Sequence, residues 1–207
     1  MSWQENGSEC FRASEYQIVA ERTANMSGTL VDVGARDKVL YQYIQGGGLR
    51  YLSSDIVPGH DFCWDLEKPL EVPDNSFEVV VALDVLERVE RIHDAFYELI
   101  RIAKGKLFVS FPNMTCLSFR LRFFRYGQLS GKHALLPIPQ SDRHRWLTSY
   151  PQVWEFVQHV AQTARCSVQR YDILQGYSRW QHLISYLPLS AALRTYTMLF
   201  EITKSAV

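Results

Sequence analysis

The sequence predicts an α/β fold in which helices cover a doubly wound, mainly parallel sheet. The first observation behind this prediction is an alternation of short apolar segments, rich in β-branched residues, with segments whose apolar residues recur at helical spacing. The second is that several predicted strands end in an acid. These acids are Asp32, Asp55, Asp65 and Asp84. Because ligands bind at the carboxyl ends of parallel strands, the two patterns together predict a binding site at that edge of the sheet.

The first predicted strand, Thr29 to Val33, leads directly into a turn at Gly34 within the stretch LVDVGARD. A glycine turn at the end of a central strand lets a ligand approach the backbone closely. The carboxylate of Asp32 just before the turn would repel a pyrophosphate and hold a cationic ligand. A buried strand with a satisfied Asp32 is the alternative interpretation of the same residues.

Helices are predicted on both sides of this strand, from Glu9 to Asn25 and from Asp37 to Ile44. The glycine triplet at 46–48 ends the second of them. No GxxxxGKS or GxxxxGKT pattern surrounds the triplet, so it is interpreted as a helix end and not as a phosphate loop.

Two further acids lie at the ends of the next predicted strands. Asp55 ends the strand Arg50 to Asp55, about 20 positions after the glycine turn, where an acid can accept hydrogen bonds from both hydroxyls of an adenosine ribose. Asp65 ends the strand His60 to Asp65. Its carboxylate can accept a hydrogen bond from the exocyclic amine of adenine, and a neighbouring backbone N–H can donate one to a ring nitrogen.

The remaining elements continue the alternation to the end of the chain. They are strands at Phe77–Leu83, Lys106–Phe111, Ser167–Leu174 and Thr195–Thr203, and helices at Ile92–Ala103, Leu117–Tyr126 and Tyr150–Ala164.

A basic and aromatic segment separates the two halves of the chain. The stretch from Phe119 to Trp146 carries six Lys or Arg residues and a single acid, Asp142. Such a helix can touch an anionic substrate, a membrane surface or a protein partner through 117–146, or it can cover the sheet with its arginines in water. The long loop at 127–145 is predicted to act as an acceptor lid.

Composition limits the classes of function. The length of 207 residues fits one domain, and 22 basic against 22 acidic residues leave no global field that would attract nucleic acid. Four widely spaced cysteines without a CxxC pair or a secretory leader predict free thiols, a cytoplasmic location and no metal site. No apolar run reaches the roughly 18 residues that cross a bilayer.

The segment from Thr29 to Phe111 resembles the class I S-adenosylmethionine-dependent methyltransferases of the small-molecule type and, more loosely, the MetW-like group. The resemblance rests on LVDVGARD, YLSSD, CWDL and VPDNSFEVVVALDVLERV, with VSFPN as a weaker continuation. It implies a Rossmann-like, seven-stranded sheet with an antiparallel last strand. It also implies a single domain over 1–207, with an N-terminal helical segment at 1–28 and a helix, loop and lid insertion at 114–165.

The same resemblance implies which residues bind S-adenosylmethionine. Asp32 would lie near the methionine amine, Asp55 would bind the ribose, Asp65 with Leu66 would frame the adenine, and the carbonyl of Leu83 would face the methionyl end. The full predicted cofactor set is Asp32, Gly34, Ala35, Arg36, Asp55, Ile56, Asp65, Leu66 and Leu83.

The sequence departs from the family pattern at three positions. Arg36 and Lys38 stand where the family's turn carries further glycines, and Arg88 follows Glu87 where many members have a histidine. Arg36 would either pair with the carboxylate of the cofactor or fill the cleft.

The predicted function is therefore methyl transfer to a small-molecule, glycan or lipid-linked acceptor. Glu87, His133 and His144 are the candidates for a general base. The alternative is a non-catalytic, methyltransferase-like partner with a degenerate cofactor site. Nicotinamide-dependent oxidoreduction is disfavoured because GARDK lacks the GxGxxG spacing, and net charge gives RNA methylation no support.

Overall fold

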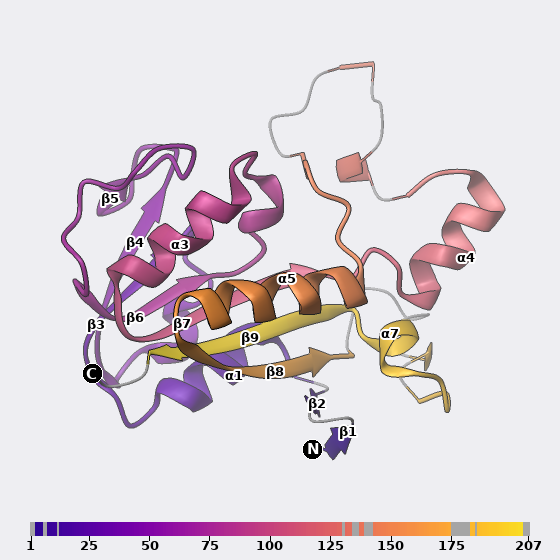
Figure 1. The fold of residues 1–207 in the computed structure, drawn as a ribbon, viewed down its shortest axis with the longest axis horizontal. Helices are drawn as coiled ribbons and strands as arrows, with labels where there is room; N and C mark the ends of the chain where they lie inside the picture. The colour runs from indigo at the N-terminus through magenta and orange to yellow at the C-terminus, as the bar shows by residue number, and fades with distance from the viewer. Residues whose placement is uncertain are drawn as a thin grey trace.

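The computed structural model describes residues 3–5, 8–11, 13–129, 131–133, 137–138, 143–174, 183–184 and 186–204. Within them a single mixed sheet runs through the molecule in the order β1-β2-β8-β9-β7-β6-β3-β4-β5, with helices on both faces (Figure 1). The predicted doubly wound α/β fold is confirmed.

The seven strands of the predicted sheet occupy one end of this order. They are β3 (Ser27–Val33), β4 (Gly48–Asp55), β5 (Phe62–Cys63), β6 (Phe77–Ala82), β7 (Ala103–Pro112), β8 (Cys166–Ile173) and β9 (Thr197–Lys204). The pairs from β5 to β7 are all parallel, whereas β9 runs antiparallel to both β7 and β8. The antiparallel last strand and its hairpin with β8 are thus confirmed.

Two apolar layers hold the helices onto the sheet. On one face α3 (Ile92–Ile102) and α5 (Tyr150–Thr163) pack over Val80 and Val109, and on the other α1 (Glu15–Thr23) packs over Val79 and Val81. Successive residues of β6 therefore face opposite layers, as the period of a strand requires. This double burial explains why FEVVVAL is almost continuously apolar.

The N-terminal region differs from the predicted helix at Glu9–Asn25. Strands β1 (Trp3–Glu5) and β2 (Ser8–Phe11) form a hairpin, and β2 pairs in parallel with β8. The residues from Glu9 to Phe11 therefore belong to a strand and not to the predicted helix. The helix begins only at Glu15 because Ser14 caps it: the hydroxyl of Ser14 accepts from the N–H of Gln17, and the side-chain oxygen of Gln17 accepts from the N–H of Ser14. The predicted helix was too long because residues 9–11 pair with β8, a contact between distant segments that local periodicity does not reveal.

The predicted helix at Asp37–Ile44 is also shorter in the structure, where α2 spans only Tyr41–Ile44. Lys38 has a left-handed backbone with φ 55°, which an α-helix does not accommodate. Turns at Ala35–Lys38 and Lys38–Tyr41 carry the chain to the start of α2.

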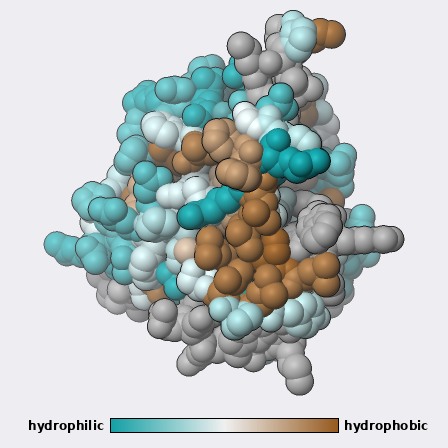
Figure 2. Space-filling view, turned by 90° about the vertical axis from the view of Figure 1, so that its right-hand side faces the viewer, coloured by the Kyte–Doolittle hydropathy of each residue, from teal (hydrophilic) through white to brown (hydrophobic). Residues whose placement is uncertain are grey.

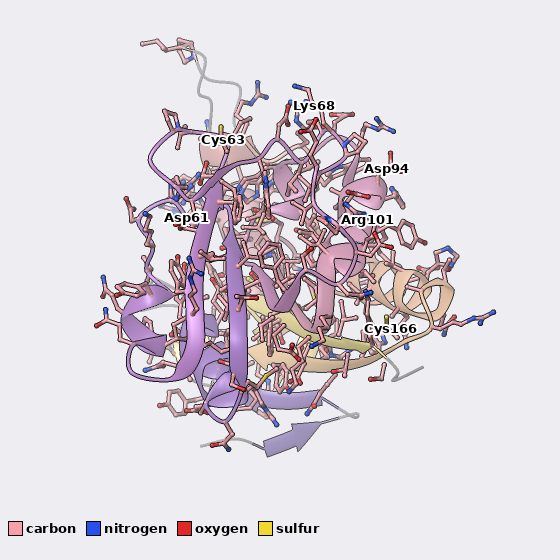
Figure 3. The ribbon with its side chains drawn as sticks, turned by 90° about the vertical axis from the view of Figure 1, so that its left-hand side faces the viewer. Asp61, Cys63, Lys68, Asp94, Arg101 and Cys166 are labelled. Atoms are coloured by element: carbon pink, nitrogen blue, oxygen red, sulfur yellow. The ribbon has the colours of Figure 1, made fainter. Side chains whose placement is uncertain are left out.

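Arg101 at the end of α3 fixes the connection between β5 and β6. Its guanidinium donates to the carbonyls of Leu70 and Val72 and pairs with Asp74 at 2.8 Å and Glu98 at 2.9 Å. Figure 3 shows Arg101 on this side of the molecule, below Lys68 and Asp94. The arrangement positions the loop that carries the turn cluster before β6.

The buried Asn113 joins the end of β7 to two later segments. Its amide nitrogen donates to the carbonyls of Ala192 and Thr195, at 2.8 and 2.9 Å, and its side-chain oxygen accepts from the backbone N–H and hydroxyl of Thr115. Asn113 therefore connects α7 (Ala191–Arg194) with the residues that precede α4 (Leu117–Tyr126).

None of the helices in the described part of the chain has the length and apolar character that crossing a membrane requires.

Candidate active site

The turn after β3 brings the backbone of two strands together. Gly34 has φ +72°, and its N–H and that of Ala35 both donate to the carbonyl of Ser54, at 2.8 and 3.0 Å. A Cβ atom at Gly34 would lie 2.5 Å from Cγ2 of Val85. Position 34 therefore excludes a side chain for two reasons, the left-handed backbone and the contact with Val85.

Arg36 and Lys38 keep the backbone shape that glycines would adopt. Their φ angles are 44° and 55°, in the left-handed region that favours glycine. The N–H of Arg36 donates to Oδ2 of Asp55 at 3.1 Å, and the ammonium of Lys38 donates to the carbonyl of Gly59. Arg36 and Lys38 therefore adopt backbone angles that glycines at these positions would also adopt.

Asp55, at the end of β4, has its carboxylate oriented by three backbone N–H groups. Oδ1 accepts from Ile56 at 2.7 Å and from Val57 at 3.3 Å, while Oδ2 accepts from Arg36. A carboxylate has about four acceptor sites, and these three hydrogen bonds leave one of them open to a hydroxyl of a ligand. Ile56 itself is exposed beside it.

Asp32 is buried within β3 and is held by a single phenol. The hydroxyl of Tyr51 donates to Oδ2 of Asp32 at 2.8 Å. Burial raises the pKa of Asp32 to about 7, against the effect of the Tyr51 hydrogen bond. A cation bound next to Asp32 would favour its ionised form.

Asp65 lies two residues beyond β5 and is already engaged. Oδ1 accepts from the N–H of Glu67, and Oδ2 pairs with Lys68 at 3.1 Å. These contacts lower the pKa of Asp65, so it is an anion at neutral pH. Lys68 and Cys63, the last residue of β5, appear at the same edge in Figure 3. Leu66 and Leu83 are both buried.

The structure brings together the three predicted general-base candidates, although they lie far apart in sequence. Nε2 of His144 lies 3.5 Å from Oε1 of Glu87, and the rings of His133 and His144 are 5.0 Å apart, edge to face. The N–H groups of Arg145 and Trp146 donate to the carbonyl of Glu87, which fixes the segment that carries His144. Of the predicted lid at 127–145, residues 130, 134–136 and 139–142 lie outside the described residues.

Two of these side chains are buried with unused polar atoms. The side chains of Glu87 and His144 are 0% and 6% exposed, and Oε2 of Glu87 and both ring nitrogens of His144 have no hydrogen-bond partner among the described residues. Burial raises the pKa of Glu87 to about 7, with the charge of Asp84 adding to the effect. Burial and the nearby cation Lys132 lower the pKa of His144 to about 3.

Further polar residues complete this site and were not among the predicted site residues. Glu15 comes from the start of α1, and burial together with the charge of Asp84 raises its pKa well above the usual value. The N–H of Asp84 donates to the hydroxyl of Ser110 on β7 at 2.9 Å. Asp84 was recognised only as a strand end, and Ser110 only within VSFPN. Glu15 carried no signal, since its segment was interpreted as packing.

The side chain of Arg36 acts on the same group of acids. Burial raises the pKa of Asp84, and the charges of Lys132, Arg88 and Arg36 oppose that rise. The guanidinium of Arg36 therefore acts toward the end of β6, where the methionyl part of the cofactor is expected. In the described part of the chain, no group of three or more His, Cys, Asp or Glu side chains is arranged to hold a metal ion.

Neither a protein-family profile nor a curated protein matches the sequence. Solved structures do match the fold. The small RNA methyltransferase HEN1 is 12% identical with a TM-score of 0.66, and the match covers 99% of this chain but only 27% of HEN1. The magnesium protoporphyrin IX methyltransferase ChlM from Synechocystis PCC 6803, which contains bound S-adenosylhomocysteine, is 16% identical with a TM-score of 0.54, over 91% of this chain and 78% of ChlM.

A third match shows how far the fold reaches. The cyclase SpnF is 17% identical with a TM-score of 0.61, over 100% of this chain and 86% of SpnF. The chain thus has the fold of the class I S-adenosylmethionine-dependent methyltransferases. The fold is also that of the cyclase SpnF, so the reaction must be argued from the site.

Proposed function

We propose that the chain is an S-adenosylmethionine-dependent methyltransferase that acts by in-line methyl transfer. The observation that carries the proposal is the turn from Gly34 to Lys38, which keeps left-handed backbones at Arg36 and Lys38 and binds the carboxylate of Asp55 through a backbone N–H. Left-handed backbones cost a non-glycine residue about 1 to 2 kcal/mol each. Retaining two of them is consistent with a turn whose shape serves a ligand.

The residues on the cofactor side would hold S-adenosylmethionine, which supplies an electrophilic methyl group when bound. Asp55 would accept the ribose hydroxyls, Asp65 and Leu66 would bound the adenine, and Asp32 would take the ammonium. Arg36 would pair with the carboxylate of the cofactor. Gly34, Ala35, Ile56 and Leu83 would contribute backbone and apolar surface.

Glu87 and His144 would contact the acceptor molecule. With a pKa of about 7, Glu87 is poised to accept a proton at neutral pH, and the low pKa of His144 keeps its ring neutral and able to orient Glu87 or the acceptor. His133 would pack against His144 and bound the same space. Alignment of the two reactants would supply much of the acceleration.

The proposed acceptor is a small molecule, a glycan or a lipid-linked molecule. The cations Arg36, Arg88 and Lys132, whose charges act on the acids of the site, support an acceptor that carries negative charge. A cytoplasmic location belongs to the same proposal, and it is supported by the reduced state of Cys63, Cys116 and Cys166, which form no disulfide among the described residues.

Calorimetric titration with S-adenosylmethionine tests the proposal, followed by a screen of acceptors for S-adenosylhomocysteine formation. Wild-type protein and Asp94→Ala, a change of an aspartate that is 61% exposed and lies on α3, should bind alike, whereas Asp55→Ala should bind more weakly. NAD is titrated in parallel as a comparison ligand. If S-adenosylmethionine gave no binding heat at any concentration, the proposal would be contradicted.

A non-catalytic, methyltransferase-like partner is the second candidate function. The position of Arg36 favours this second function. Its charge acts on Asp84, so its guanidinium could occupy space that a cofactor needs. If Arg36→Gly bound S-adenosylmethionine and the wild type did not, this second function would replace the first.

A further inference from the structure

Helix α4 projects from the body of the molecule. None of its ten residues, all of which the structure describes, is buried, and Phe124 is 91% exposed. Its link to the body on one side is the stacking of Phe119 on Tyr196, with ring centroids 5.7 Å apart. A helix held in this way leaves most of its surface without a covering layer.

The outward side of α4 is apolar with basic borders. Leu117, Leu121 and Phe124 follow one another at helical spacing, opposite the side on which Phe119 contacts Tyr196. Arg120 lies on one border of this stripe and Arg125 on the other. A helix with an apolar stripe between cations has the composition of an element that lies in a membrane interface.

A second apolar element lies on the same side of the molecule. Leu183, Tyr186 and Leu187 are exposed just before α7, and Figure 1 places α7 beside α4. Figure 2 shows a continuous hydrophobic area over this face, with hydrophilic side chains at its borders. We call this face the α4–α7 face and define it by Leu121, Phe124, Leu183, Tyr186 and Leu187.

The charged residues in the two stretches of sequence that carry the α4–α7 face are all basic. No Asp or Glu occurs in the sequence between Glu98 and Asp142, or between Asp172 and Glu201, and these two stretches contain all the residues of the face. Because the whole chain has no net charge, any attraction to an anionic surface must come from this local excess of arginine.

We propose that the α4–α7 face docks on an anionic lipid surface, a proposal that does not depend on the activity of the site. A second copy fits the face poorly, because a twofold contact would bring arginines against arginines without an acid to pair them. An RNA partner is favoured less, because Leu121, Leu183 and Leu187 are aliphatic and make up most of the face, which leaves only Phe124 and Tyr186 as rings on which bases could stack. Projecting aliphatic and aromatic side chains with basic borders match a headgroup layer above acyl chains.

Vesicle flotation of the full chain tests this proposal. Vesicles of phosphatidylcholine mixed with phosphatidylglycerol should carry the protein upward, and those of phosphatidylcholine alone should carry much less. Leu121→Ser with Phe124→Ser should weaken the partition at least about tenfold. Arg120→Gln with Arg125→Gln should weaken it and reduce its dependence on salt.

Matched controls lie elsewhere on the surface. Tyr41→Ser with Val57→Ser removes similarly exposed apolar side chains, and Arg91→Gln with Lys104→Gln removes similarly exposed cations. Both should float like the wild type, with circular dichroism confirming that every variant folds.

Three results would overturn the proposal. The first is an absence of flotation, or equal flotation with neutral vesicles. The second is a gel shift of single-stranded RNA that Leu121→Ser with Phe124→Ser abolishes while flotation is unchanged. The third is a dimer in sedimentation that the same variant dissociates, which would assign the face to a second copy.

Discussion

The two halves of the candidate site are built in different ways. The proposed cofactor half is built on one backbone turn: the N–H groups of Gly34 and Ala35 donate to the carbonyl of Ser54, and that of Arg36 donates to the carboxylate of Asp55. The acceptor half is made of side chains from distant segments, with Glu87 following β6 and His144 reaching it from the lid. Because the hydrogen bonds of the turn use main-chain atoms, positions 35 and 36 can change side chain while the turn keeps its shape, and only position 34 requires glycine. The second half depends on particular side chains.

Replacing Glu87 should sharpen this contrast most. Glu87→Gln removes the group proposed to accept a proton, so turnover should fall about 100-fold or more while the Kd for S-adenosylmethionine changes less than about threefold. Turnover is measured as S-adenosylhomocysteine formation with the acceptor found by screening, and the Kd is measured by calorimetry. Glu90→Gln, a change of an exposed glutamate near Glu87, should leave both unchanged. Equal losses in turnover and binding would mean that the two halves are not separable.

Asp55→Ala should produce the opposite pattern. Two ribose hydroxyls would lose their acceptor, so binding of S-adenosylmethionine should weaken by about 2 kcal/mol, or roughly 30-fold. Three backbone N–H groups also lose their partner, so the free energy of unfolding must be measured alongside the Kd. An unchanged Kd in a folded variant would remove Asp55 from the site.

Asp32 should couple binding to pH. Its folded pKa is raised to about 7, so its contribution to stability is complete below the ordinary value of 3.8 and is lost as the pH rises through about 7. A bound ammonium would favour the ionised form, so binding should release a proton and strengthen about tenfold from about pH 6 to about pH 8, relative to Asp32→Asn. Calorimetry in buffers of different ionisation enthalpy counts the proton. Parallel pH profiles in the two proteins would exclude a role for Asp32.

The smallest expected effect separates the backbone of Arg36 from its side chain. Arg36→Ala and Arg36→Gly both remove the guanidinium, but only glycine relieves the left-handed φ of 44°. Arg36→Gly should therefore unfold with a free energy about 1 kcal/mol higher than Arg36→Ala. If Arg36 pairs with the cofactor carboxylate, both variants should bind S-adenosylmethionine more weakly than the wild type. Tighter binding would show that Arg36 obstructs the site.

The sequence was sufficient for the parts of the molecule that depend on local pattern. Alternating apolar segments predicted the parallel strands, and acids at or near the strand ends pointed to the edge that carries the candidate site. The sequence was insufficient for the parts of the fold that depend on contacts between residues far apart in the chain. The β1–β2 hairpin exists because β2 pairs with β8, more than 150 residues away in the chain. Glu15 enters the site because α1 starts beside Asp84, and neither segment contains a signal of the other.

The hydrogen bonds of Asn113 imply that one edge of the molecule opens cooperatively. This single buried amide satisfies carbonyls before β9 and groups ahead of α4. Separating either segment would leave its donors or acceptors unpaired, at a cost of about 1 to 3 kcal/mol for each group. In the native ensemble, α7 and the residues leading into α4 are therefore expected to lose their protection from hydrogen exchange together, as one subglobal unit distinct from the fraying of the projecting helix itself.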